Sequence, residues 1–228
     1  MADIRLIEIR EDILSDNMQV AEEIRQNLSR EGVFMLNLMA SPGGGKTSLI
    51  LETIHRLRNE FRIAVIEGDI DSTVDAEKVA AVGIPAVQLR TGGACHLDAP
   101  MIRMALDGMD LSALDLLLIE NVGNLVCPAE FDTGATKRAM ILSVPEGDDK
   151  PLKYPLMFSV CDALVVNKID YLPDPGFSME ALRERVLKLN PGIRIFEVSC
   201  RTGAGLDAWV SWLREQVKLE RIEQHGPL

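Results

Sequence analysis

The sequence predicts an α/β fold, with a mainly parallel sheet and flanking helices. Apolar segments of strand length alternate with segments whose apolar residues recur at helical spacing. Polar or glycine-rich residues follow the apolar segments directly, as they do at the carboxyl ends of parallel strands, where such sheets bind ligands. No internal repeat or low-complexity linker divides the 228 residues, so we expect one domain over residues 1–228.

The composition restricts the classes of partner. A formal net charge of −11 argues against nucleic acid, which needs a basic surface, and against attraction to anionic membranes. No apolar run approaches the length of a membrane span, and the first residues contain no signal region, so we expect a cytoplasmic protein. Cysteines are reduced in that compartment, which favours metal binding or burial over disulfides for Cys95, Cys127, Cys161 and Cys200.

The first elements surround a glycine-rich turn. Residues 3–10 alternate loosely and predict a short edge strand. The apolar spacing over residues 12–30 predicts a leading helix, which Gly32 is placed to end. Buried strands are predicted at residues 33–39 and 62–66, with the turn and a helix between them.

The middle of the chain continues the alternation of strands and helices. Ser72-Thr73-Val74-Asp75 has the pattern of a capping box and predicts a helix through Ala81. A short strand is predicted at residues 86–89. Asp98 is expected to cap the next helix, with Pro100 in its first turn. A further strand is predicted at residues 114–119.

The remaining elements complete the sheet. Residues 145–151 are rich in Pro, Gly and Asp and predict a surface loop. The apolar stripe formed by Leu206, Trp209, Val210, Leu213 and Val217 predicts a final helix over about residues 204–220. Strands are predicted at residues 137–144, 163–166 and 193–198, and a helix at residues 179–189.

Residues 40–47, with the sequence Ala-Ser-Pro-Gly-Gly-Gly-Lys-Thr, have the strand–turn–helix context of a phosphate-binding loop. The backbone N–H groups of such a turn form an anion-binding concavity at a helix N-terminus. Lys46 would reach the β- and γ-phosphates, and the Thr47 hydroxyl would bind Mg²⁺. Ala40 replaces the usual first glycine, which is harmless if its φ is negative and strained if it is positive. The predicted nucleotide contacts here are Gly43, Gly44, Gly45, Lys46, Thr47 and Ser48.

Asn167-Lys168-Ile169-Asp170 resembles the guanine-specificity motif of G proteins. Guanine presents N1–H and N2–H₂ donors on one edge, and the Asp170 carboxylate can accept both. Adenine lacks this donor pair and would leave Asp170 unpaired. The Lys168 stem can cover a face of the base. Ser199-Cys200 lies where G proteins place a loop whose backbone contacts the guanine oxygen.

Glu120-x-x-Gly123 resembles the Asp-x-x-Gly switch of GTPases, with Glu in place of Asp. The Glu120 carboxylate would hold Mg²⁺, and the Gly123 N–H would contact the γ-phosphate. Asp69 and Asp75 are further candidates for Mg²⁺ or for the attacking water, although Asp75 could equally complete the capping box. We therefore expect Lys46, Asp69 and Glu120 to be catalytic.

Cys95, His96 and Cys127 predict a second metal site. Thiolate and imidazole ligands suit Ni²⁺, Zn²⁺ or Cu, not Mg²⁺. Cys95 and His96 follow a Gly-Gly turn, and Cys127 precedes a proline shortly after Gly123. Three ligands from one chain leave a coordination position that is open or is filled by another subunit.

Three segments together resemble the HypB family of hydrogenase nickel-incorporation GTPases: residues 93–99 (GACHLDA), 120–129 (ENVGNLVCPA) and 153–155 (KYP). The resemblance implies a P-loop GTPase of the SIMIBI class that dimerises with GTP and holds Ni²⁺ or Zn²⁺ at Cys95, His96 and Cys127. It also implies a role in delivering nickel to the large subunit of [NiFe]-hydrogenase with a HypA-type zinc protein. Unlike some members, the chain has no N-terminal Cys-x-x-Cys-Gly-Cys motif or histidine-rich tract, and its histidines are His55, His96 and His225.

Two alternatives remain. A related chaperone GTPase that serves urease or a cobalamin-dependent mutase shares the phosphate loop and the guanine motif, but the cysteine-containing segments argue against it. A small-molecule kinase with structural cysteines would need an acceptor pocket, and Asn167 to Asp170 favour guanine over adenine. Nucleotide preference separates the kinase from the GTPases.

Overall fold

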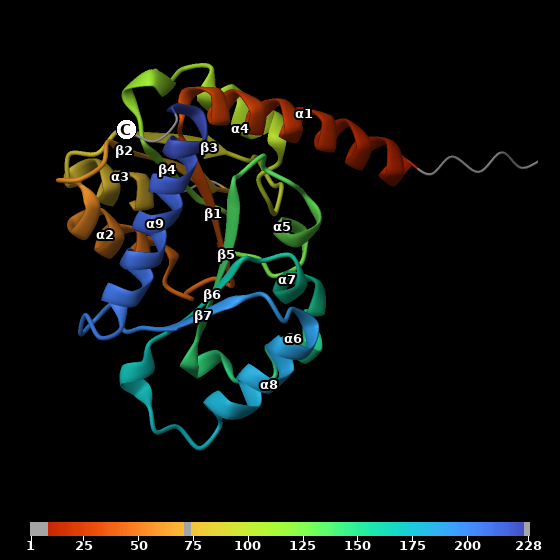
Figure 1. The fold of residues 1–228 in the computed structure, drawn as a ribbon. Helices are drawn as coiled ribbons and strands as arrows, with labels where there is room; N and C mark the ends of the chain where they lie inside the picture. The colour runs from red at the N-terminus through yellow and green to blue at the C-terminus, as the bar shows by residue number, and fades with distance from the viewer. Residues whose placement is uncertain (1–8, 71–73, 226–228) are drawn as a thin grey trace, which may run out of the picture.

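The computed structural model describes residues 9–70 and 74–225, which form a seven-stranded parallel sheet covered by helices on both faces (Figure 1). The strand order is β3-β2-β4-β1-β5-β6-β7, and every neighbouring pair is parallel. The strands are β1 (Phe34–Ala40), β2 (Ile63–Asp69), β3 (Ala86–Arg90), β4 (Leu116–Glu120), β5 (Lys137–Ser143), β6 (Ala163–Asn167) and β7 (Arg194–Glu197). The fold class expected from the sequence is confirmed.

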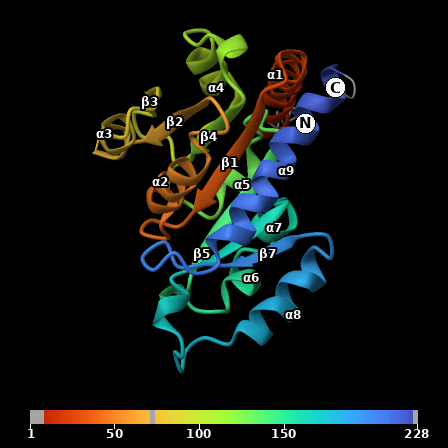
Figure 2. The same cartoon turned by 60° about the vertical axis from the view of Figure 1, so that its left-hand side comes forward.

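Alternation along the strands divides the core into two layers, because successive side chains point to opposite faces. Residues 34, 36, 38 and 40 of β1 pack with α2 (Lys46–Leu57), α3 (Val74–Ala81) and α9 (Leu206–His225) on one face. The opposite face is covered by α1 (Ile9–Glu31) and α4 (Ala99–Leu106) over one half of the sheet and by α7 (Pro155–Ser159) and α8 (Met179–Leu189) over the other. Figure 2 shows α9 crossing in front of the sheet.

Two local predictions at the helix starts can be compared with the structure. The Asp98 carboxylate accepts a hydrogen bond from the Met101 N–H at 2.9 Å and caps α4, with Pro100 in the first turn, which confirms the cap. Ala40 ends β1, and the one non-glycine residue with positive φ in the described chain is Lys168. The Ala40 substitution in the phosphate loop is therefore unstrained.

Other element predictions need correction. Ile9 and Arg10 belong to α1, so they are not part of an edge strand, while residues 1–8 lie outside the described chain. The predicted loop at residues 145–151 is instead a 3-10 turn, Val144–Glu146, followed by α6 (Lys150–Lys153), because Glu146 caps the turn and Pro151 is buried. The last helix runs to His225 and not to residue 220. Two further 3-10 turns are Leu111–Ala113 and Ile169–Tyr171.

The capping box expected at Ser72 to Asp75 lies largely outside the described residues, and α3 begins at Val74. Within the described residues, no helix has the length and apolar character needed to cross a membrane.

Candidate functional site

The phosphate loop leaves the central strand β1 and turns into α2 at Gly45, which has a φ of 103°. A Cβ atom at Gly45 would lie 2.3 Å from the Asn167 Nδ2 atom, so the turn has no room for a side chain there. A Cβ atom at Gly44 would lie 3.1 Å from that of Ala40. Close approach of the ends of β1 and β6 therefore favours glycine at Gly44 and Gly45, and positive φ favours it at Gly43 and Gly45.

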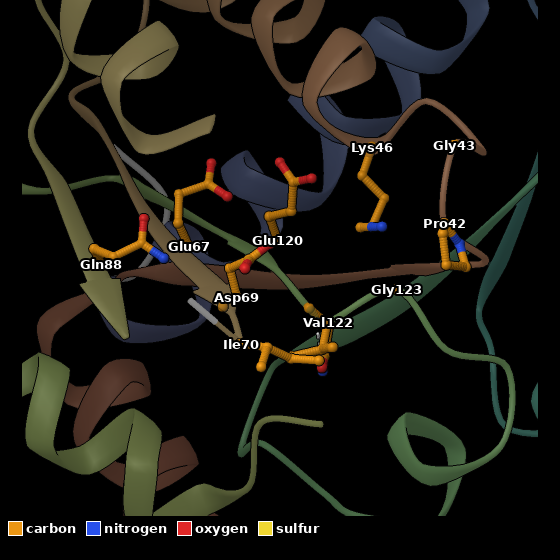
Figure 3. A pocket seen from close by; sticks show the side chains of 12 residues that line it. Pro42, Gly43, Lys46, Glu67, Asp69, Ile70, Gln88, Glu120, Val122 and Gly123 are labelled. Carbon is orange, nitrogen blue, oxygen red and sulfur yellow. Dashed lines mark hydrogen bonds between the residues drawn. The ribbon is translucent and has the colours of Figure 1, made fainter. Parts of the chain in front are cut away.

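A cavity of about 300 Å³ opens beside the loop, at the carboxyl ends of β1, β2 and β4. Figure 3 shows Lys46 on one side of it and acidic side chains from two strands on the other. The Thr47 hydroxyl donates to Glu120 Oε1 at 2.9 Å. A hydroxyl and a carboxylate so close together are oxygen ligands that fit Mg²⁺. The cavity is lined by Pro42, Gly43, Lys46, Glu67, Gly68, Asp69, Ile70, Gln88, Glu120, Asn121, Val122 and Gly123.

The strand register brings two residues into this cavity that the sequence analysis did not select. Glu67 pairs with Glu120 of β4 on one side and with Gln88 of β3 on the other, so all three side chains share one face. Glu67 is 2% exposed, and the buried Gln88 Nε2 has no hydrogen-bond partner among the described residues. Asp69 lines the same cavity. Asp75 lies on α3, and its side chain is outside the described part of the chain.

A second cavity, of about 230 Å³, adjoins the other side of the phosphate loop. Asn167 donates to the Gly44 carbonyl at 3.2 Å, and the Lys168 ammonium donates to the Gly43 carbonyl at 2.8 Å. The predicted guanine motif is thus hydrogen-bonded to the phosphate loop, although it is more than 120 residues away in the chain. The cavity is lined by Gly45, Ser48, Asn167, Lys168, Asp170, Tyr171, Cys200 and Arg201.

Asp170 is held from two directions in this second cavity. The Ser199 hydroxyl donates to Asp170 Oδ1 at 2.5 Å, and Arg201 Nη2 lies 2.5 Å from Oδ2. The hydrogen bond from Ser199 is the main cause of a lowered pKa at Asp170, and Arg201 adds to it, so the carboxylate is ionised at neutral pH. The Cys200 N–H donates to Asn167 Oδ1 at 3.3 Å, while burial raises the pKa of the Cys200 thiol to about 11. Sequence reasoning did not identify Arg201.

Cys95, His96 and Cys127 lie together, as expected from the sequence. Their ligand atoms are all within 4.8 Å of one another, and the two Sγ atoms are 2.8 Å apart. The His96 ring stacks on Phe131 with centroids 3.9 Å apart. Burial lowers the pKa of His96, which favours the neutral, metal-binding imidazole. The hydrogen bond with Cys95, followed by burial, raises the pKa of Cys127, so a metal ion must displace a proton there.

The other two cysteines do not belong to this cluster. Cys161 is buried, and burial raises the pKa of its thiol far above the usual range, as expected for a core residue. Cys200 lines the second cavity instead. Within the described residues, one group of three side chains has the ligand types and spacing of a metal site, and it consists of Cys95, His96 and Cys127.

The parallel sheet and the phosphate loop between β1 and α2 define a P-loop nucleotide-binding protein. Comparison with known families narrows this class, since residues 34–197 match the CobW/HypB/UreG nucleotide-binding domain. The chain belongs to the HypB group of this family, whose members are P-loop GTPases.

Three relatives support this membership. Hydrogenase maturation factor HypB of Azotobacter vinelandii is 47% identical over 212 residues, which cover 93% of this chain and 70% of the relative. The crystal structure of hydrogenase maturation factor HypB from Archaeoglobus fulgidus is 41% identical, has a TM-score of 0.83, and matches 90% of this chain and all of that one. The structure of HypB from Helicobacter pylori in complex with nickel is 39% identical, has a TM-score of 0.85, and matches 90% of this chain and 97% of that one.

Proposed function

We propose that this protein is a GTP-hydrolysing metallochaperone that binds Ni²⁺ or Zn²⁺ at Cys95, His96 and Cys127 and assists nickel insertion into [NiFe]-hydrogenase. One observation carries the proposal. The segment that joins Glu120 and Gly123, beside the phosphate loop, to Cys127, in the thiol–imidazole cluster, is a single stretch of eight residues. A change at the γ-phosphate position can therefore alter the geometry of a metal ligand directly.

Hydrolysis needs little covalent chemistry from the protein. Lys46 is 9% exposed and lies at the start of α2, where its charge and the N-terminal N–H groups stabilise the developing negative charge of the phosphates. Thr47 and Glu120 would hold Mg²⁺, which neutralises phosphate charge when bound. Asp69 and Glu67 lie on the far side of the cavity from Lys46 and are positioned to orient water (Figure 3).

Gly123 connects hydrolysis to metal release. A Cβ atom at Gly123 would lie 3.1 Å from the Cα and N atoms of Pro42, so this backbone rests against the phosphate loop. Its N–H would bond to the γ-phosphate and lose that partner on hydrolysis. We infer that Cys127 then shifts relative to Cys95 and that the metal ion is released.

A second copy of the chain would complete the metal site. The cluster offers three ligands, and structural and catalytic sites for these metals usually have four or more. Val126, which precedes Cys127, is 48% exposed, and Leu156 is 47% exposed on α7, which contacts the short helix Cys127–Glu130. Apolar side chains beside an incomplete metal site favour a GTP-promoted homodimer. By kinship with hydrogenase maturation factors, we also propose a HypA-type zinc protein and the hydrogenase large subunit as partners.

The direct test compares phosphate release from GTP and ATP, with and without a large subunit that lacks nickel. We expect GTP to be hydrolysed slowly, ATP not at all, and Lys46→Ala to remove the activity. Nickel binding should be lost in Cys95→Ala and kept in the matched control Cys161→Ala. Transfer of phosphate from ATP to a small molecule would favour the kinase alternative. Nickel affinity that is unchanged in Cys95→Ala would contradict the metallochaperone proposal.

A further inference from the structure

The thiol–imidazole cluster is assembled from two loops that have different connections to the phosphate cavity. Cys127 follows Glu120 and Gly123 along the chain, so it is connected covalently to that cavity. Cys95 and His96 lie between β3 and α4, and no short stretch of chain links them to the phosphate loop. If only Cys127 moved when the nucleotide changed, Cys95 and His96 would stay in place and the cluster would not respond as a unit.

The side chain of Asn121 bridges the two loops. Asn121 is fully buried, with 0% exposure, and follows Glu120 directly. Its Oδ1 atom accepts from the Leu97 N–H at 3.0 Å and from the Val122 N–H at 2.9 Å. Leu97 is the residue after His96. The bridge therefore joins Asn121, which follows the proposed Mg²⁺ ligand Glu120, to Leu97, which follows the proposed metal ligand His96.

The same side chain is anchored to the strand that carries the phosphate loop. Asn121 Nδ2 donates to Asn37 Oδ1 at 3.2 Å, and Asn37 is 1% exposed on β1. The Asn121 backbone N–H donates to the Leu38 carbonyl of the same strand at 3.0 Å. Asn121 thus contacts β1, its own loop and the β3–α4 loop at once.

A second contact between the loops is more exposed. Asn124 Nδ2 donates to the Cys95 carbonyl at 3.3 Å, and Asn124 Oδ1 accepts from the Val126 N–H at 2.9 Å. Water can replace such hydrogen bonds at a half-buried position with little loss. Water cannot replace the hydrogen bonds of Asn121 in this way, because Asn121 is fully buried. Separating the loops would therefore leave the Leu97 and Val122 N–H groups buried without partners.

We propose that Asn121 is the positioning residue that couples Cys95 and His96 to the nucleotide state, so that all three cluster ligands move together. The proposal rests on the proposed function, since it specifies how the phosphate cavity regulates that metal site. Asn121 is among the residues that line the phosphate cavity, but its side chain is fully buried and is hydrogen-bonded to Leu97, Val122 and Asn37, so it acts here as a positioning residue. Loss of the Asn121 side chain should therefore remove the coupling between nickel and the nucleotide, while the protein still binds both.

The test measures nickel affinity by titration in the presence of GDP and of a non-hydrolysable GTP analogue. The ratio of the two Kd values is the coupling ratio. Asn121→Ala removes the bridge, and Asn121→Ser is a second variant whose hydroxyl is too short to reach Leu97. Asn121→Asp keeps the acceptor for both N–H groups. Asn37 Nδ2, which has no hydrogen-bond partner among the described residues, can turn toward the new carboxylate.

Asn17→Ala is the matched control. Asn17 is also a buried asparagine, and its Oδ1 accepts from the N–H of Ala99, the first residue of α4 after the same loop, at 2.8 Å. However, Asn17 belongs to α1 and has no contact with the segment from Glu120 to Cys127 among its hydrogen bonds. Its loss should cost similar stability without affecting the coupling.

The expected result is a coupling ratio within about twofold of one in Asn121→Ala and Asn121→Ser, and a ratio close to wild type in Asn121→Asp and Asn17→Ala. Fluorescent GDP establishes the nucleotide concentration that saturates each variant, and the nickel titrations are run at that concentration. A wild-type coupling ratio in Asn121→Ser or Asn121→Ala would overturn this inference and leave the proposed function standing. An equal loss of coupling in Asn17→Ala would do the same. A ratio of one in the wild-type protein would overturn the proposed function and this inference with it.

Discussion

At the scale of single residues, Asp170 is an ionised carboxylate in the second cavity, and we propose that it recognises guanine. Asp170 is bonded by Ser199 and Arg201, and these partners hold its pKa below the usual range. Arg201 is 69% exposed and also lies over the Tyr171 ring, so of the two partners of Asp170 it is the one that solvent reaches. An arriving guanine would then exchange one exposed partner of Asp170 for two N–H donors.

Asp170→Asn should change the nucleotide that is bound. The amide offers one acceptor and one donor, which matches xanthine, whose N1–H and O2 lie where guanine has two donors. We expect GDP affinity to fall by at least about 100-fold, because two hydrogen bonds to a charged group are lost, and xanthosine diphosphate affinity to rise. Competition against fluorescent GDP measures both. The exposed Asp207→Asn is the control, and unchanged GDP binding by Asp170→Asn would contradict the guanine assignment.

At the scale of elements, the turn between β1 and α2 depends on what packs around it. Gly43 and Gly45 both have positive φ, at 76° and 103°. A Cβ atom at Gly43 would meet nothing within 4 Å, whereas one at Gly45 would collide with Asn167. The end of β6 therefore contributes to the shape of the phosphate loop.

An alanine at either glycine would be strained by the positive φ, but only an alanine at Gly45 would also collide with Asn167. Gly45→Ala should weaken GDP binding more than Gly43→Ala, by at least about tenfold, because Asn167 must move and lose its bond to the Gly44 carbonyl. Isothermal titration of GDP into both variants measures the difference. Equal losses would mean that packing against Asn167 has no part in forming the loop.

At the opposite, amino-terminal ends of β2 and β4, an ion pair joins the strands. The Asp115 carboxylate accepts from the Arg62 N–H at 2.8 Å and from the Arg62 guanidinium at 2.8 and 3.0 Å, and Arg221 of α9 lies 3.3 Å away. Burial by itself would raise the pKa of Asp115, but the hydrogen bonds from Arg62 outweigh it and lower the pKa. This pair stabilises the fold far from the nucleotide cavities.

Asp115→Asn should destabilise the protein by about 2 kcal/mol at pH 7, the scale of charge-assisted hydrogen bonds lost beside a buried group. Because the folded pKa lies below the usual value of 3.8, the stabilisation is complete above that pH and is lost as the pH falls through the folded pKa. The difference from wild type in urea unfolding should therefore shrink below about pH 4. A difference that stays constant with pH would contradict this account, and the exposed Asp110→Asn is the control.

At the scale of the whole molecule, strand order places the segment from Glu120 to Gly123 between Glu67 and the phosphate loop. β4 lies between β2 and β1, so Glu120 to Gly123 leave the sheet beside Glu67 on one side and the phosphate loop on the other. The chain then continues to Cys127. A parallel sheet with this order brings the nucleotide cavities and the thiol–imidazole cluster to one edge.

The sequence predicted those features that depend on local patterns. Each of the seven strands, the phosphate loop, the guanine motif and the three cluster ligands could be located from spacing and residue type, because each is a short, contiguous signal. Glu67, Gln88 and Asn121 could not be selected in this way. Their positions depend on strand register and on hydrogen bonds between distant segments, which no local pattern specifies.

The measurement that tests the central claim most directly is a nickel titration of the wild-type protein with its mass followed in solution, first with GDP and then with a non-hydrolysable GTP analogue. The account predicts that the analogue produces a dimer, that nickel affinity differs between the two nucleotides, and that Cys95→Ala abolishes the difference. Nickel binding that is the same with both nucleotides, in a protein whose mass does not change, would contradict the coupling of the GTPase site to the metal site.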